Sequence, residues 1–270
     1  MISTPEAIAI AELSVYSPIL LLTFIIVFRH GFKRQSGWIY LAIFCIVRIA
    51  GAALKILSAE HPQSIDDAEW AVILQSVGLS PLLLATFGLL KRITDLVTTS
   101  VRSEGTNIAM IGTGGKIGNL IANRANAASL RSRIIQLSHI PIVIGLVLCI
   151  VGGTDTGDVK KGITFTKAGI VIFLVFYIVL AVLIAVTARD VSNAPRGEKR
   201  LYWAIVAAIP FLGVRLLWSL IAVFGHDKKF SITGGDPWVN FGMAVVEEFI
   251  IVCMYTVLGL TLGKGDVLRE

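Results

Sequence analysis

Charged residues are scarce in this chain of 270 residues. Asp, Glu, Lys and Arg make up 16% of it, whereas soluble domains usually contain about 25%. The deficit arises from long apolar stretches of the kind that cross a bilayer. An ordinary water-soluble domain is therefore excluded, and the lipid bilayer is the first expected partner.

Cysteine is also sparse. The three cysteines, Cys45, Cys149 and Cys253, all fall inside apolar stretches, and the sequence contains neither a CxxC motif nor a cluster of His and Cys. We expect these cysteines to be small packing residues, with no metal site and no cofactor. An Asn-x-Ser/Thr glycosylation acceptor is absent as well.

Seven apolar stretches each have about the 20 residues that a helix needs to cross a bilayer. They predict an all-α polytopic membrane bundle of seven transmembrane helices, forming a single domain over residues 1–270. The polar segment 93–132 is predicted to be a cytosolic loop, either flexible or carrying a short surface helix. The predicted spans are 7–28, 37–58, 70–91, 133–153, 168–188, 201–224 and 239–262.

Basic residues are distributed unevenly between the two sides of this predicted topology. The connections on one side, together with the C-terminal tail, carry 16 Lys and Arg, and those on the other side carry five. The positive-inside rule places the C-terminus in the cytosol and the N-terminus outside or in a lumen. The same asymmetry accounts for the net charge of +6, so no nucleic-acid partner is expected. Span lengths fit the endoplasmic reticulum and the plasma membrane equally.

Five charged residues interrupt the apolar stretches. They are Glu12, Arg48, Arg215, Glu247 and Glu248. A charge at the bilayer centre costs about 2.5–3.5 kcal/mol on insertion scales, so such residues are usually paired and functional. With a rise of about 1.5 Å per residue, four of them are expected in the outer half of the bundle and Arg48 near the midplane.

Two further polar residues belong to this region. Lys55 follows Arg48 at i+7, on the same face of the second span and near its outer mouth, and Gln75 lies in the third span at a depth similar to that of the charges. We expect Arg48, Arg215, Gln75 and Lys55 to bind a ligand in a polar pocket in the outer half of the bundle.

A structural alternative needs no ligand. Arg215 would pair with Glu247 or Glu248, and Arg48 with Glu12, and these bridges would only fix the helix packing. Two mid-membrane arginines nevertheless face three carboxylates, so one acid would lack a cationic partner and stay protonated. Glu12, Glu247 and Glu248 are therefore candidate general acids, and the sequence does not choose among them.

Several motifs along the chain resemble those of a known family. They are Gly37-Trp38, Arg48-Ile-Ala-Gly51, Gly78-Leu-Ser-Pro81, and Arg215-Leu-Leu-Trp218-Ser219 followed by Glu247-Glu248. Over nearly its whole length the chain resembles a family of fungal seven-helix membrane proteins of unknown function. It is also loosely similar, in helix count and in the late Arg and Glu positions, to fungal RTA-like lipid-translocating exporters. The resemblance implies a filamentous fungus and a place in a secondary-metabolite gene cluster.

Three functions remain open at this point. The leading hypothesis is a non-catalytic membrane protein that binds, senses or moves a lipophilic small molecule through the polar pocket. A membrane-embedded acid/base enzyme, such as a terpene-type cyclase or isomerase, is the first alternative. A seven-helix receptor is the second, because an outside N-terminus matches the receptor layout. The sequence leaves the oligomeric state undetermined.

Overall fold

The computed structural model describes residues 4–30, 36–60, 65–110, 116–154, 159–191, 196–225 and 237–262, and these are almost entirely helical. Seven helical spans are long and apolar enough to cross a membrane, which confirms the predicted all-α bundle. The orientation of the termini stays a prediction. The elements are α1 (Thr4–His30), α2 (Ser36–Glu60), α3 (Ile65–Val77), α4 (Leu79–Met110), α5 (Lys116–Thr154), α6 (Val159–Val191), α7 (Arg196–Phe224), α8 (Pro237–Asn240), a π-helical turn (Phe241–Val245) and α9 (Val246–Thr261).

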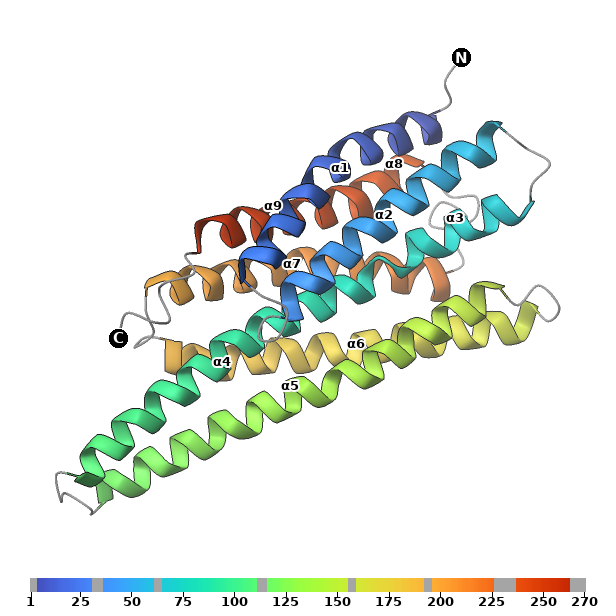
Figure 1. Cartoon of the computed structure of the whole chain (residues 1–270). Coiled ribbons are helices and arrows are strands. Elements are labelled where there is room, and N and C mark those ends of the chain that lie inside the picture. Colours follow the sequence, from blue (N-terminus) through green and yellow to red (C-terminus); the bar gives the residue numbers. More distant parts are fainter. Residues whose placement is uncertain are drawn as a thin grey trace.

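The helices run along one long axis, with α1, α2 and α9 on one side of the bundle and α5 and α6 on the other (Figure 1). α3 and α4 together supply the third span, and α4 packs against α2, α5, α6 and α7. In the most apolar part of this span 78% of the residues are buried, compared with 22–44% in the other six spans. The third span is therefore the central helix of the bundle, and lipid-facing surface belongs mainly to the others.

The central span is interrupted between α3 and α4. Pro81 has no N–H with which to bond the carbonyl of Val77, and the Ser80 hydroxyl donates to that carbonyl instead, at 3.0 Å. Gly78 occupies the turn between the two helices. The interruption thus has a local cause in the Gly-Leu-Ser-Pro sequence. Three other prolines lie inside uninterrupted helices: Pro18, Pro141 and Pro210.

The segment 93–132, predicted as a loop, is mostly helical. α4 continues to Met110 and α5 begins at Lys116, while residues 111–115 lie outside the described residues. Figure 1 shows the two helices running together beyond the rest of the bundle, and the Ser132 hydroxyl donates to Asp95 Oδ1 at 2.5 Å. Apolar length determines where a span leaves the bilayer, but a helix continues until something stops it. The segment contains no proline that would do so.

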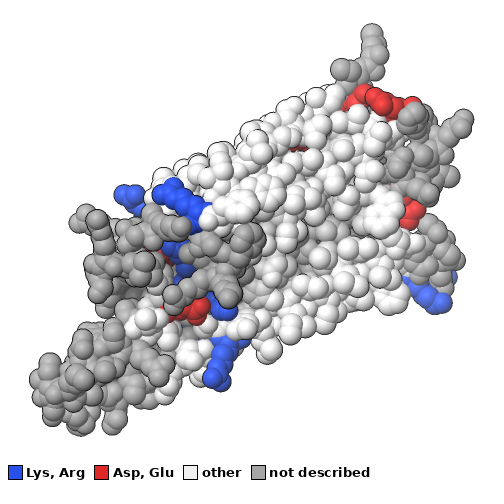
Figure 2. All heavy atoms as spheres, in the orientation of Figure 1, with Lys and Arg blue, Asp and Glu red and all other residues white. Residues whose placement is uncertain are grey.

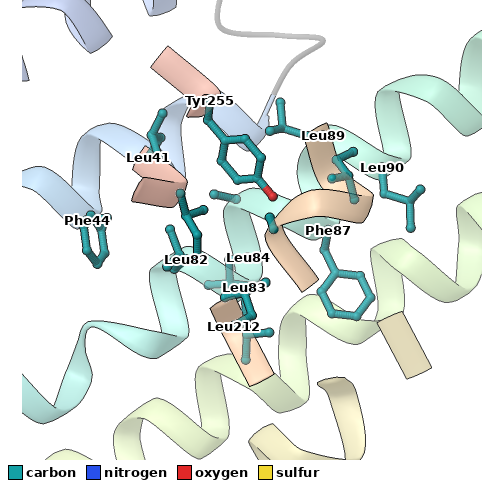
Figure 3. Close-up of a cluster of buried hydrophobic side chains, with 14 of the residues drawn as sticks. Leu41, Phe44, Leu82, Leu83, Leu84, Phe87, Leu89, Leu90, Leu212 and Tyr255 are labelled. Atoms are coloured by element: carbon teal, nitrogen blue, oxygen red, sulfur yellow. The ribbon is translucent and has the colours of Figure 1, made fainter. Parts of the chain in front are cut away.

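The apolar core lies where the central helix meets its neighbours (Figure 3). Tyr255 of α9 is fully buried, and its hydroxyl forms a 3.1 Å hydrogen bond with the hydroxyl of Thr86 on α4. The polar end of this large side chain is thereby satisfied inside the bundle. Around it lie buried side chains of α2, α4 and α7, among them Leu41, Phe44, Leu82, Leu83, Phe87 and Leu212.

On the face shown in Figure 2, charged side chains gather at the two ends of the molecule, and the surface between the ends is almost uncharged. Lys and Arg predominate at the end where α9 stops, as the sequence asymmetry leads one to expect. Large apolar side chains are exposed along the middle, for example Leu21, Leu137 and Ile140. Such a surface is stable in lipid, where the backbone polar groups are satisfied within the helices.

Close helix packing depends on glycine at one position in α9. A Cβ added at Gly259 would lie 2.9 Å from atoms of both Ile26 and Trp38, whereas one added at Gly242 would meet nothing within 4 Å. We expect Gly259→Ala to lower the free energy of unfolding by about 1–3 kcal/mol through overpacking. Gly242→Ala should leave it unchanged or raise it slightly, because alanine favours helix. Thermal unfolding in detergent measures both, and equal midpoints for the two variants would contradict the packing.

Candidate functional site

Glu248 is the common acceptor of the two intramembrane arginines. One carboxylate oxygen, Oε2, pairs with Nη2 of Arg48, and the other, Oε1, accepts from Nε of Arg215 at 2.5 Å. The side chains of Glu248 and Arg215 are completely buried, and Arg48 is 2% exposed. A single carboxylate on α9 therefore links α2 to α7 inside the bundle. We call Arg48, Arg215 and Glu248 the buried charge triad.

All three guanidinium nitrogens of Arg215 donate hydrogen bonds. Besides Glu248, its guanidinium donates from Nη1 to the Ser219 hydroxyl at 2.7 Å and from Nη2 to the backbone carbonyl of Gln75 at 3.1 Å. It also lies 4.9 Å from the centre of the Trp218 ring. Each guanidinium nitrogen thus has a partner, and these bonds tie α7 to α3 as well as to α9. Arg215 is positioned as a structural member of the triad, with little capacity left for a ligand.

The guanidinium group of Arg48 has fewer hydrogen-bond partners than that of Arg215. Its Nη1 lies 3.8 Å from Oε2 of Glu12, which is an ion-pair distance but too long for a direct hydrogen bond. Its Nε, although buried, has no hydrogen-bond partner in the part of the chain that the structure describes, and neither has Oε1 of Glu12. The guanidinium lies 5.7 Å from the Phe44 ring. Arg48 and Glu12 thus retain bonding capacity that Arg215 and Glu248 have used.

The break in the central span gives the triad its space. A Cβ at Gly78 would lie 3.2 and 3.3 Å from the two carboxylate oxygens of Glu248 and 3.3 Å from Nε of Arg48. Those distances are tighter than ordinary van der Waals contact, so glycine allows the charged groups to approach the backbone. The Gly78–Pro81 motif therefore both interrupts the helix and makes room for the charges.

The neighbouring acid Glu247 forms no ion pair with the triad among the described residues, although it is close enough for its charge to act on Arg215. It is only partly buried, and its Oε2, which is buried, has no hydrogen-bond partner among the residues described. Adjacent helical side chains point about 100° apart, so the two glutamates cannot meet the same groups. Both glutamates follow directly after the π-helical turn Phe241–Val245. π-Helical turns are often found at functional sites.

A narrow cleft opens beside Arg48, between α1, α2 and α3. It encloses about 200 Å³ of empty space, which includes space open to the surroundings, and it does not admit a sphere the size of water. Lys55 is half-buried at this cleft, and Gln75 forms part of its wall. The cleft is lined by Glu12, Val47, Arg48, Gly51, Ala52, Lys55, Leu74 and Gln75.

The sequence-predicted residues therefore separate into three groups. Glu12, Arg48, Lys55 and Gln75 line the cleft. Arg215 and Glu248 lie behind Arg48 in the buried network. Glu247 stands outside both. A carboxylate whose two oxygens both accept from guanidinium groups offers no proton to a substrate, so this geometry disfavours Glu248 as a general acid.

A second buried ion pair was not anticipated from the sequence. Arg92 of α4 donates from Nε and Nη2 to the same oxygen of Glu198 on α7, at 3.2 and 2.9 Å. The two residues are 7% and 5% exposed. Arg92 lies just beyond the predicted third span, 70–91, where a basic residue is expected in solvent. Its position directly after an apolar stretch is the signal in the sequence that could have placed it on the continuing helix.

Histidine and cysteine contribute no further site among the described residues. His139 Nδ1 lies 2.8 Å from the backbone carbonyl of Ile135, and its ring centre is 5.6 Å from that of Tyr40. Groups of three or more His, Cys, Asp or Glu that could hold a metal ion are absent within the described ranges.

The triad predicts that neutralising Glu248 destabilises the protein, and the adjacent Glu247 provides a matched control. Glu248→Gln removes the charge between two buried guanidinium groups and should lower the free energy of unfolding by about 3–5 kcal/mol, the usual cost of breaking a buried pair. Glu247→Gln, an identical chemical change outside the triad, should cost about 1 kcal/mol or less. Thermal unfolding in detergent distinguishes them. A Glu248→Gln protein as stable as the Glu247→Gln protein would show that the triad does not hold the bundle.

Comparison with known proteins gives one finding. The chain matches a family model described as a domain of unknown function (DUF7702) over residues 2–111 and 105–265. No curated protein and no solved structure matches it. The predicted resemblance to an uncharacterised family is thus confirmed at that level, while the fungal origin and the similarity to RTA-like exporters stay predictions. Because the two matched stretches together cover residues 2–265, the chain belongs to the DUF7702 family.

Proposed function

We propose that this protein binds a lipophilic small molecule at the cleft between α1, α2 and α3, and that binding serves to sense the molecule or to move it. The observation that carries this proposal is the position of Arg48. One side of its guanidinium group borders the cleft, and the other is paired to the fully buried Glu248. A ligand that contacts Arg48 therefore acts on a group that holds three helices together.

The cleft has the composition expected of a site for an amphipathic molecule. Its polar wall comes from Glu12, Arg48, Lys55 and Gln75, and its remaining lining residues are apolar or small. Ligand sites typically combine an apolar lining with a few placed polar groups. The first two spans, which supply most of the cleft lining, are only 33% buried in their most apolar parts, and this exposure supports entry of such a molecule from the bilayer.

The narrowness of the cleft supports sensing or movement more than storage. A space that excludes a water-sized sphere accepts a ligand only after side chains or helices shift. A ligand that binds the shifted arrangement better stabilises it by that difference in affinity. Through Glu248, such a shift at Arg48 reaches Arg215 on α7.

The wider biological setting is part of the same proposal. The resemblance to fungal seven-helix proteins supports a role in secondary metabolism, and the similarity to lipid-translocating exporters supports movement of the ligand. The endoplasmic reticulum and the plasma membrane both fit the span lengths. Biosynthetic genes beside the gene for this chain would support the metabolic role.

Blocking the cleft provides the test. Val47 lines it, and the adjacent Ile46 is 46% exposed on the outer surface of α2 and does not line it. We expect Val47→Phe to weaken binding of an amphiphile by about tenfold, the effect of 1.4 kcal/mol of steric cost, and Ile46→Phe to leave binding unchanged. Scintillation proximity with the purified protein and tritiated dodecanol, dodecanoate and dodecylamine measures the affinities. Failure of all three compounds to bind would refute the proposal, as would equal binding by the two variants.

A second function, membrane-embedded acid/base catalysis, is favoured by Glu247. This carboxyl group has a buried oxygen without a partner among the described residues, directly after the π-helical turn. Of the three candidate acids it is the one outside the ion pairs, so it is best placed to act as general acid in a cyclase or isomerase.

Product analysis separates the enzyme from the binding protein. Microsomes containing the protein and a pool of lipophilic precursors should yield a new product if Glu247 is a catalytic acid, and Glu247→Gln should reduce that product at least about 100-fold. Glu248→Gln is unsuitable for this test because its expected loss of stability would itself reduce the amount of product. A product that persists unchanged in Glu247→Gln would exclude this residue as the acid.

A further inference from the structure

The charged groups at the cleft differ in how fully they are already bonded. Arg215 and both oxygens of Glu248 are committed to one another and to neighbouring groups. Arg48 directs Nη1 toward Glu12 at 3.8 Å, too far for a hydrogen bond, while its unpartnered Nε lies toward Gly78. The groups available to a ligand are therefore Arg48, Lys55 and Glu12.

These three groups leave an excess of positive charge at the cleft. Arg48 and Lys55 are cations, and Glu12 is the one acid among the eight lining residues. Glu248 adds a negative charge behind Arg48, but it is shared with Arg215 and so neutralises each arginine only in part. The lining residues alone therefore carry two cations and one anion, a surplus of one positive charge.

We infer that the molecule bound at this cleft carries a single anionic head, a carboxylate, which pairs with Arg48 and Lys55 in place of Glu12. This inference rests on the proposed function and names the class of its ligand. One negative charge balances the surplus. A carboxylate oxygen can accept a charge-assisted hydrogen bond from Nη1 of Arg48, whose present contact with Glu12 is too long for one.

The opposing residues make an amine or a neutral head a poorer fit. An ammonium group would meet one acid, Glu12, and two cations, and like charges in low dielectric repel strongly. An alcohol would leave the surplus charge unbalanced. The tail of a carboxylate amphiphile would lie against Val47 and Leu74, the larger apolar residues of the lining.

Lys55 is the side chain that can open the cleft. It is half-buried, and no hydrogen bond or ion pair of its ammonium group occurs within the described ranges. Its four-carbon stem allows the ammonium group to move aside and then return to an anionic head. Lys55→Met removes the charge while keeping a flexible apolar stem, so the buried triad should remain intact.

Two variants with opposite expected effects test the inference. Lys55→Met should weaken binding of dodecanoate by about tenfold, whereas Glu12→Gln should strengthen it, because the competing acid is removed. Lys167 supplies the matched control: it lies over the Phe224 ring at 5.3 Å, away from the cleft, so Lys167→Met should bind dodecanoate as the unaltered protein does. Scintillation proximity with tritiated dodecanoate, dodecanol, dodecylamine and dodecyl phosphate provides the comparison.

The outcomes distinguish this inference from the proposed function. Preference for dodecanoate over dodecanol and dodecylamine, with the two opposite shifts, supports it. Tighter binding of dodecyl phosphate than of dodecanoate would overturn the carboxylate assignment while keeping an anionic head. Tighter binding of dodecanol or dodecylamine, or a loss of affinity in Glu12→Gln, would overturn the anionic head and leave the binding function standing. If none of the four compounds binds, the proposed function fails and the inference fails with it.

Discussion

The bundle depends on one carboxylate shared by two arginines. Glu248 of α9 pairs with Arg48 of α2 and Arg215 of α7, and all three side chains are buried. None of these charges is stable alone in an apolar interior, because removal from water costs several kcal/mol per ion. Glu248 therefore holds both arginines in place. The interruption of the central helix places Gly78 beside these groups, where an added Cβ would crowd them at 3.2–3.3 Å.

The triad also determines which charged groups beside the cleft retain bonding capacity. Arg215 has a partner for every guanidinium nitrogen, so it is a fixed support. Arg48 faces the cleft with bonding capacity left over, and Lys55 and Glu12 stand beside it. Under the proposed function, a ligand there would change the electrostatic field at Arg48, which is bonded through Glu248 to the rest of the bundle. The proposal thereby couples ligand binding at the cleft to helix packing at the centre.

Much of the fold could be predicted from the chain because lipid imposes strict rules on sequence. Apolar length gave the seven spans, and the scarcity of charge made Arg48, Arg215 and the three glutamates conspicuous. The paired helices beyond the bilayer were not predicted, because hydropathy marks the end of a span and not the end of a helix. The Arg92–Glu198 pair was missed for a related reason: a charge at the end of an apolar run reads as solvent-exposed unless its helix is known to be central.

The sequence by itself determined the class of the molecule and the residues on which its interior depends, since charges inside apolar spans require partners whatever the fold. Only the tertiary structure decided which residues form the ion pairs. Glu247 and Glu248 are chemically identical neighbours, yet the 100° between them on the helix sends Glu248 to both arginines and leaves Glu247 outside the ion pairs. The direction of a side chain depends on helix rotation and packing, which composition and spacing do not specify. That rotation separates the residues that support the bundle from those that face the cleft.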